Sequence, residues 1–359
     1  MANRIKVGIW GLGRAGWGMH TKELDRYKEE FEIVAGCDVL PERPKRLAER
    51  YPDCRCYTDG NEFLADPDVE LVAVAVRSPQ HIDYAIRALE SGKYVFLEKP
   101  VALSGAALEP LEAAMKKHPG KLFFRQNRRF EAAFCHVREI IDSGILGNVY
   151  EIKLCRHSFQ YREDWQAIVE CGGGQLNNWG PHLVDHALRL LGAPVRDIWS
   201  DLKNINGLGD AEDTVKMIFR GENGRVVDVE ISGAVALNSP VYAVYGDRGS
   251  LVCPDEQDIC LRYLAPGEKR PTSAASAATP PQDGGFGTVP NPKWIRKTIM
   301  VEPACGATMQ DIYHHLYRAI REGVPFPITA EEVFSVVRAT EIIKRQNPQF
   351  RLKTDEFGK

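Results

Sequence analysis

The segment Ile5-Lys6-Val7-Gly8-Ile9-Trp10-Gly11-Leu12-Gly13-Arg14-Ala15-Gly16 decides the fold of the N-terminal part of the chain. A short apolar strand runs into a Gly-x-Gly-x-x-Gly turn, and a helical pattern follows the turn. Asp38 ends the next predicted strand, 22 residues beyond Gly16. This context is typical of dinucleotide-binding βαβ units. Gly11 permits a tight turn, Gly13 lets backbone N–H groups approach a pyrophosphate, and Gly16 lets helix and strand pack closely.

The same segment predicts NAD as the cofactor. The turn, with Arg14 and Ala15, would hold the pyrophosphate at the positive end of the helix dipole. Asp38 would accept hydrogen bonds from the hydroxyls of the adenosine ribose. Val39 and Leu40 follow it, so no adjacent Arg or Ser is available for a 2′-phosphate, and NADP is the less favoured alternative. A tight strand–helix turn that binds no nucleotide is the structural alternative.

Two sequence patterns succeed each other along the chain. Up to about residue 125, apolar strands alternate with helices, as in a parallel sheet. Farther on, long strands follow one another, and in 226–232 apolar and polar residues alternate. We therefore predict an α/β Rossmann domain over 1–125 and an α+β domain over 126–359, with a large open, mainly antiparallel sheet. One face of that sheet is left without sequence-adjacent helices, which predicts a homo-dimer or homo-tetramer.

The composition limits the classes of binding partner and indicates the cellular compartment. The 359 residues include 46 Lys and Arg and 49 Asp and Glu, a net charge of -3, which gives no strong field for nucleic acid or an anionic membrane. Neither a membrane-spanning run nor a signal-peptide pattern is found, so we expect a cytoplasmic protein. Nine scattered cysteines predict reduced thiols and no metal site. The Pro-, Gly- and Ser-rich segment 265–292 predicts a surface loop, either a lid or a hairpin tip.

Glu98 and Lys99 stand at the end of an apolar strand, just before Pro100. Ligands of open α/β sheets bind at this edge. Lys99 would hydrogen-bond a substrate hydroxyl and favour the developing alkoxide. The alternative is a strand-end lysine paired with Glu98.

A second segment begins with three glycines, Gly172-Gly173-Gly174, and continues as a predicted helix. On that helix Asn178, His182, Asp185 and His186 would form one polar stripe. His182 suits a general base for a hydroxyl group. Asp185 would orient His182 or pair with Arg189, and for His186 a structural role is expected.

Taken in order, these motifs resemble the glucose–fructose oxidoreductase / inositol dehydrogenase / rhizopine catabolism (Gfo/Idh/MocA) family of NAD(P)-dependent dehydrogenases, over nearly the whole chain. The resemblance implies that Lys99 and His182 form the catalytic pair. It also implies a nicotinamide pocket lined by Pro79, His81, Glu98 and Asn127, and Ser78 is counted with these cofactor-binding candidates. The motifs are the glycine turn, Asp38, Pro79-Gln80-His81, Gly92-Lys93-Tyr94-Val95-Phe96-Leu97-Glu98-Lys99-Pro100, Asn127-Arg128-Arg129-Phe130, Gly144-Ile145-Leu146-Gly147, and Gly172-Gly173-Gly174 with His182 and Asp185.

One position departs from the family pattern. Many members carry Asp four residues before the catalytic His, whereas this chain has Asn178, which cannot take up a proton. Proton transfer would then rest on His182 and Lys99, and Asn178 would position a substrate hydroxyl. The segment 177–182 also resembles a subset that acts on glycosides or anhydrosugars, some of which oxidise the C3 hydroxyl.

The substrate side is predicted in 156–166, where aromatic residues mix with Arg, His and Gln. Arg156, Tyr161 and Trp165 are the candidates, and a polar surface loop is the alternative. For the acidic segment 209–213 we expect surface solvation.

Together these features predict an NAD-dependent dehydrogenase that oxidises a secondary hydroxyl of a sugar, polyol or glycoside. One alternative is a redox-assisted glycoside hydrolase or lyase that retains its NAD. The other is a non-catalytic NAD or sugar sensor, which would need neither Lys99 nor His182.

Overall fold

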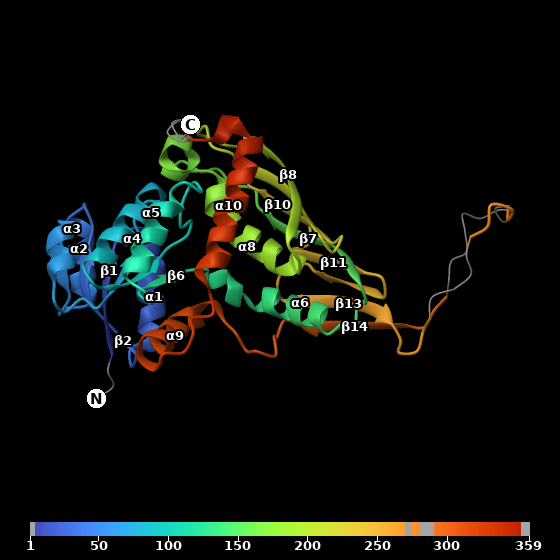
Figure 1. The fold of residues 1–359 in the computed structure, drawn as a ribbon, viewed down its shortest axis with the longest axis horizontal. Helices are drawn as coiled ribbons and strands as arrows, with labels where there is room; N and C mark the ends of the chain where they lie inside the picture. Colours follow the sequence, from blue (N-terminus) through green and yellow to red (C-terminus); the bar gives the residue numbers. More distant parts are fainter. Residues whose placement is uncertain (1–3, 270–274, 281–290, 353–359) are drawn as a thin grey trace.

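The computed structural model describes residues 4–269, 275–280 and 291–352, which form two sheets with helices between and around them (Figure 1). The N-terminal sheet has six parallel strands in the order β3-β2-β1-β4-β5-β6, the order of a Rossmann fold. Its strands are β1 (Ile5–Trp10), β2 (Phe31–Cys37), β3 (Arg55–Tyr57), β4 (Leu71–Val74), β5 (Tyr94–Leu97) and β6 (Leu122–Phe124). The helices are α1 (Thr21–Leu24), α2 (Glu42–Arg50), α3 (Gly60–Ala65), α4 (His81–Glu90) and α5 (Leu108–Lys117). The predicted Rossmann sheet is confirmed.

The second sheet has eight strands in the order β14-β13-β12-β11-β7-β10-β9-β8. The strands are β7 (Val149–His157), β8 (Val195–Lys203), β9 (Thr214–Gly221), β10 (Val226–Ser232), β11 (Tyr242–Gly246), β12 (Gly249–Cys253), β13 (Asp258–Leu264) and β14 (Trp294–Met300). Every pair is antiparallel except β7 with β10, which is parallel. The mainly antiparallel sheet is therefore confirmed, with one parallel pair at its centre.

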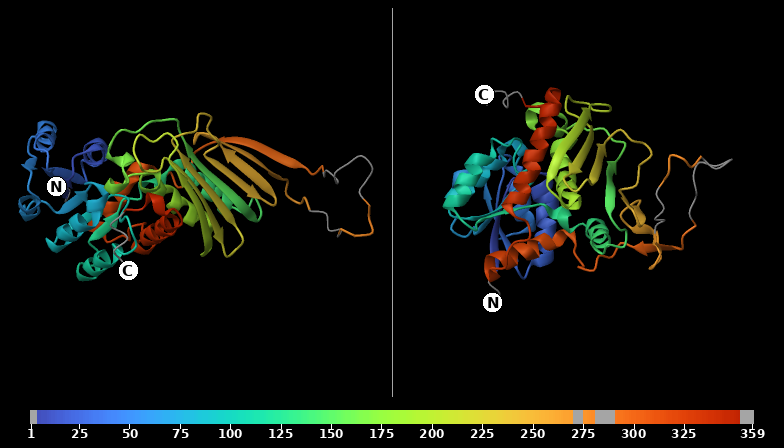
Figure 2. Two further views of the ribbon diagram at one scale, coloured as in Figure 1. Left: turned by 90° about the horizontal axis from the view of Figure 1, so that it is seen from above. Right: turned by 45° about the vertical axis from the view of Figure 1, so that its right-hand side comes forward.

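Helices cover one face of the second sheet (Figure 2). Val227, Val229 and Ile231 face these helices and are at most 1% exposed, whereas Asp228 and Glu230 on the other face are partly exposed. The covering helices are α6 (Ala132–Asp142), α8 (Gly180–Leu191) and α10 (Ala330–Gln346). The alternation read from the sequence thus orients β10 correctly.

The C-terminal part of the chain returns to the first sheet. Ile312, Tyr313 and Leu316 of α9 (Ile312–Tyr317) are fully buried in the core of the Rossmann sheet. Helix α10 begins at a capping box of Thr329 and Glu332, and it lies between the two sheets (Figure 1). By packing, residues from 312 on therefore belong partly with the first core, although the predicted boundary assigns them to the second domain.

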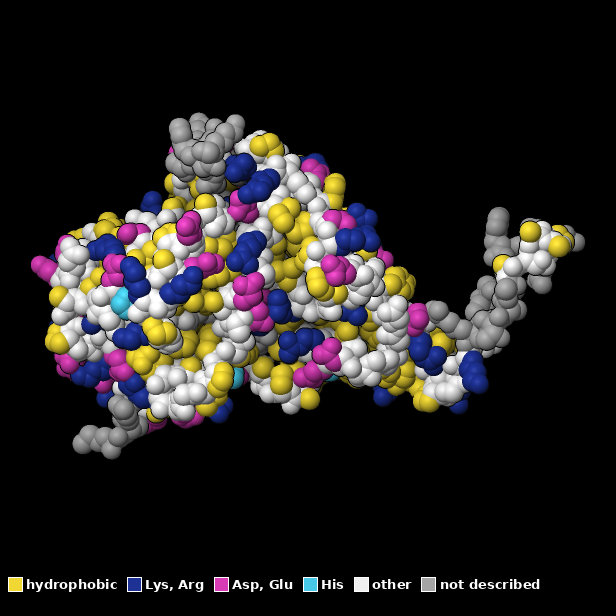
Figure 3. Space-filling model, viewed as in Figure 1, with side chains coloured by type: hydrophobic (Ala, Val, Ile, Leu, Met, Phe, Trp, Pro, Cys, Tyr) yellow, Lys and Arg dark blue, Asp and Glu magenta, His cyan; other side chains and the backbone are white. Residues whose placement is uncertain are grey.

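Several predictions concern the surface. Of the predicted loop 265–292, residues 270–274 and 281–290 lie outside the described residues, and the described remainder carries no helix or strand. All nine cysteines are free of disulfide bonds in the structure. Within the described ranges, no helix has the length and apolar character to cross a membrane. Figure 3 shows acidic and basic side chains interspersed over one face, with no large area of a single sign.

Candidate active site

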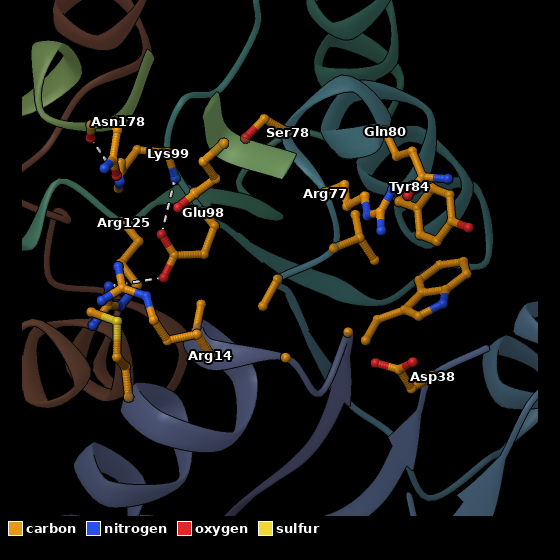
Figure 4. A pocket seen from close by; sticks show the side chains of 18 of the residues that line it. Arg14, Asp38, Arg77, Ser78, Gln80, Tyr84, Glu98, Lys99, Arg125 and Asn178 are labelled. Carbon is orange, nitrogen blue, oxygen red and sulfur yellow. Dashed lines mark hydrogen bonds and ion pairs between the residues drawn. The ribbon is translucent and has the colours of Figure 1, made fainter. Parts of the chain in front are cut away.

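A cavity of about 1030 Å³ lies between the Rossmann sheet and the second domain. Figure 4 shows Asp38 and Tyr84 at one end and Lys99 and Asn178 at the other, with Arg14 on the side of the glycine turn. The first end lies where β1 and β2 finish, which is the edge at which open α/β sheets bind ligands. The cavity is long enough to bring the predicted cofactor and substrate residues into one space.

The glycine turn has the shape that a pyrophosphate requires. Gly11 adopts φ +96°, and a Cβ on it would overlap the backbone of Ala75. A Cβ on Gly16 would overlap the carbonyl oxygen of Gly11, so Gly16 supports the turn from beneath and does not line the cavity. Above Gly13 the nearest atom to a Cβ would be Arg43 Nη1, 3.9 Å away. The open space over Gly13 therefore fits a phosphate group against the backbone N–H groups.

Asp38 is 6% exposed and already holds the loop around it. Its Oδ2 accepts a hydrogen bond from Leu12 N at 2.7 Å, and its Oδ1 accepts one from Leu40 N at 3.0 Å. Arg43 Nη1, from α2, lies 3.1 Å from Oδ2. No arginine is adjacent to Asp38 in the sequence, but the fold brings Arg43, five residues farther along the chain, into contact with it. The part of the NAD preference that rested on a missing arginine is therefore wrong.

Lys99 lies at the end of β5, next to a buried ion-pair network. Its Nζ donates to the backbone carbonyl of Asn178 at 2.9 Å, and burial lowers its pKa to about 8. Glu98 pairs with Arg125 at 2.9 Å and with His20 at 3.1 Å, not with the Lys99 ammonium. Burial alone would raise the pKa of Glu98, but Arg125 and His20 together hold it below its usual value. Among the described residues no carboxylate forms an ion pair with the Lys99 ammonium, although the charge of Glu98 acts on it, and Lys99 lines the cavity.

The predicted single helix with a polar stripe is two helices. Helix α7 (Gln175–Asn178) ends before Trp179, and α8 begins at Gly180 with Pro181 in its first turn. His182 is 7% exposed and lines the cavity, and its Nδ1 has no hydrogen-bond partner within the described structure. Burial, then the charges of Lys99 and Arg128, hold its pKa well below the usual value. The imidazole is therefore neutral at neutral pH and has one unprotonated ring nitrogen.

The remaining members of the stripe have structural partners. Asp185 accepts two hydrogen bonds from Arg129, at 2.6 and 2.9 Å, so the predicted contacts with His182 and Arg189 are wrong. Arg189 pairs instead with Glu332 at 2.7 Å. His186 lies against the carbonyl of Arg128 and stacks on the ring of Phe134, in agreement with the structural role expected of it.

Most predicted site residues meet in the cavity, and a few do not. Those that line it are Gly11, Gly13, Arg14, Ala15, Asp38, Ser78, Glu98, Lys99, Asn127, Trp165, Asn178 and His182. Pro79 and His81 lie outside the lining, and the ring nitrogens of His81 contact the carbonyls of Pro100 and Val76. Arg156 is held by Glu131 and Glu256, and Tyr161 is 62% exposed. As substrate contacts, Arg156 and Tyr161 are not supported.

Several residues that line the cavity were not predicted from the sequence. Trp179 lines the cavity, and the Arg128 guanidinium lies 4.2 Å from its ring. In the sequence, Trp179 follows the predicted Asn178 and Arg128 follows the predicted Asn127. Trp10 and Tyr84 lie at the Asp38 end with ring centroids 4.3 Å apart. Other missed residues are Met19, Arg77, Gln160, Arg162, Gln166, Met309 and Gln310. A signal was available for Trp179 and Arg128, which flank motif residues, but not for Met309 and Gln310, which come from a distant segment.

One group of side chains outside the cavity has metal-like spacing. Cys155 and His157 on β7 face Glu230 on β10, with their potential ligand atoms within 4.8 Å of one another. However, His157 Nδ1 accepts a hydrogen bond from Ser239 N at 3.2 Å. In the neutral ring the proton then sits on Nε2, the atom that points toward the group, and this arrangement does not suit a cation.

Comparison with known proteins agrees with this geometry. The family described as "Oxidoreductase family, NAD-binding Rossmann fold" matches residues 5–125, and the GFO/IDH/MocA C-terminal domain matches residues 134–252. A scyllo-inositol 2-dehydrogenase (NADP(+)) of Bacillus subtilis is 26% identical over 97% of this chain and 95% of its own length. An inositol 2-dehydrogenase of Acidothermus cellulolyticus is 28% identical over 75% of this chain and 78% of its own.

Solved structures show the same fold. An NAD-binding protein from Listeria innocua superimposes with a TM-score of 0.79 at 22% identity, over 97% of this chain and 96% of that one. The glycine turn, the open space above it and the two matched domains together confirm NAD as the cofactor predicted for the fold. The chain is a member of the Gfo/Idh/MocA family of NAD-binding oxidoreductases.

Proposed function

We propose that the protein oxidises a secondary hydroxyl of a sugar, polyol or glycoside, with the C3 hydroxyl of a glycoside among the candidates, by hydride transfer to NAD. The observation that carries this proposal is that Lys99 and His182, which come from different domains, line the same cavity as the glycine turn. One is an amine with a lowered pKa and the other is a neutral imidazole. Lys99 is suited to moving a proton near neutral pH, and the neutral His182 offers a ring nitrogen that can accept a hydrogen bond.

The arrangement divides the work between the two domains. Bound NAD, held at the glycine turn and at Asp38, would supply a hydride acceptor. His182, whose buried Nδ1 lacks a partner in the described structure, would accept a proton or a hydrogen bond from the substrate hydroxyl. Lys99 donates one N–H to the carbonyl of Asn178. Its two other N–H groups would be available to the substrate oxygen when that oxygen gains negative charge. Trp179 and Trp165 offer apolar surfaces to a sugar ring.

NAD is the proposed physiological cofactor, with NADP as a weaker ligand. Asp38 presents a buried carboxylate where the ribose hydroxyls of NAD would lie, and a 2′-phosphate would be repelled by it. Arg43 beside it offsets part of that repulsion. One relative is named as an NADP(+) enzyme, so both cofactors belong in the test.

The test is a panel of inositols, sugars and glycosides incubated with purified protein and either NAD or NADP, read by the absorbance of the reduced cofactor. We expect NADH to form with one class of substrate, and inositols come first because two relatives carry that name. Absence of reduced cofactor with the whole panel would contradict the proposal. Release of free sugar from a glycoside without net NADH would instead support the hydrolase or lyase alternative.

A further inference from the structure

The acidic segment 209–213 is not a solvated surface stretch, as the sequence suggested. Glu212 is only 4% exposed, and its carboxylate lies against Gly174. It does not line the main cavity and has no part in the chemistry proposed above. Among the described residues no Lys or Arg side chain donates a hydrogen bond to its carboxylate, and burial of a carboxylate in this way is costly, so its contacts need an explanation.

Two of its hydrogen bonds go to the start of helix α7. Glu212 Oε1 accepts a hydrogen bond from Leu176 N at 2.9 Å, and the Glu212 carbonyl accepts one from Gln175 N at 3.0 Å. Gly174 adopts φ +98°, and a Cβ there would overlap both carboxylate oxygens of Glu212. The carboxylate therefore occupies the space that the missing side chain of Gly174 leaves, and it satisfies the N–H of Leu176, whereas the backbone carbonyl of Glu212 satisfies that of Gln175.

Helix α7 is a single turn of four residues, so contacts that hold the position of its first residues also hold that of its last residue. That last residue is Asn178, whose carbonyl oxygen accepts the 2.9 Å hydrogen bond from Lys99 Nζ. We propose that Glu212 is a positioning residue, which holds Lys99 in its reactive orientation through α7 and the Asn178 carbonyl. The role assigned to Lys99 rests on the proposed function.

Protonation of Glu212 should loosen this arrangement. Burial raises the pKa of the Glu212 carboxyl to about 7, with opposing contributions from the N–H groups and from Lys344 on α10, and a further rise from the neighbouring Asp213. Arg162 lines the small cavity beside it. A neutral acid is a weaker acceptor than a carboxylate. The turnover rate should therefore fall below about pH 7 for a reason that lies outside the catalytic pair.

Two variants separate positioning from a general structural role. Glu212→Ala removes the acceptor and should lower kcat by about 10- to 100-fold, as expected for a small displacement of a catalytic group, with KM for NAD unchanged. Glu212→Gln keeps an acceptor for Leu176 N but is neutral at every pH, like the protonated acid. Its kcat should therefore stay near the low-pH value of the wild type and show no decline near pH 7. Asp210→Asn is the matched control, because exposed Asp210 accepts from Val169 N in the same segment without reaching α7. A pH profile of Glu212→Gln identical to that of the wild type would overturn the proposal.

A measurement without turnover separates this proposal from the proposed function. In the Glu212→Ala variant, brief treatment with acetic anhydride followed by peptide mass spectrometry should show faster acetylation of Lys99, whose Nζ leaves the Asn178 carbonyl. The exposed Lys117 should react at an unchanged rate. Unchanged labelling of Lys99 would refute the positioning role even if the enzyme is active. Altered labelling in a protein that oxidises no alcohol would refute the proposed function alone.

Discussion

Replacing Asp38 by Ala should reverse the preference of the protein for NADH over NADPH. The buried carboxylate lies at the end of β2, where it would accept hydrogen bonds from the ribose hydroxyls of NAD. Hydrogen bonds to a charged group contribute about 1.5–3 kcal/mol each. Loss of one such bond, about 2 kcal/mol, should weaken the binding of NADH by roughly 30-fold. NADPH should bind as well as before or more tightly, because its 2′-phosphate no longer meets a carboxylate and Arg43 is released to pair with it.

The assay is a fluorescence titration of NADH and NADPH on the wild type and on Asp38→Ala, with the ratio of the two Kd values as the readout. Asp38→Asn is the companion variant, since it retains an acceptor for Leu12 N or Leu40 N if the Ala variant folds poorly. Arg43→Met is the converse control and should weaken NADPH only. Equal losses of affinity for both cofactors would refute the ribose role of Asp38 and leave it as a purely structural link.

Three other predictions follow from the same contacts. Lys99→Ala and His182→Ala should each lower kcat by about 10²–10⁴-fold with unchanged NAD affinity, whereas Asn178→Ala should cost less because Lys99 contacts only its backbone; steady-state rates and NAD titrations check this. The chain should be a dimer or tetramer by light scattering. A monomer at micromolar concentration would contradict the prediction that the open sheet face forms the contact between subunits. Because the folded state raises the pKa of Glu212 from 4.5 to about 7, it binds a proton that the unfolded state has lost, so this group stabilises below pH 4.5 and the contribution is lost as pH rises to 7. Urea unfolding should therefore show Glu212→Gln gaining about 3 kcal/mol on the wild type between pH 4.5 and 8, and a pH-independent difference would count against the raised pKa.

Local patterns predicted the fold well because each acts within one element. The apolar strand and glycine turn at 5–16 placed the cofactor end, and the alternation in β10 oriented the second sheet. The parallel pairing of β7 with β10 was not predictable, because register between distant strands leaves no trace in either strand alone. The return of α9 to the first core has the same cause: its apolar face shows that it is buried, but not against which sheet.

The site was predicted where side chains follow one another in a motif. Lys99, Asn178 and His182 line one cavity, but the break at Trp179 was missed although Gly180 and Pro181 signal a new helix start. Arg43 and Glu212 were missed for another reason. Their roles depend on contacts made only after folding, with Asp38 across a loop and with the N-terminus of α7 across the chain.

The most direct test of the central claim is a transfer of label. With a substrate from the panel that carries deuterium on the carbon of its reacting hydroxyl, mass spectrometry of the cofactor after a single turnover follows the hydride. Lys99 and His182 meet the glycine turn across one cavity. The account therefore predicts that the wild type places deuterium on NAD, and that Lys99→Ala and His182→Ala bind NAD equally well but transfer the label at least about 100-fold more slowly. Transfer at the wild-type rate by either variant would contradict the assignment of that residue to the chemical step.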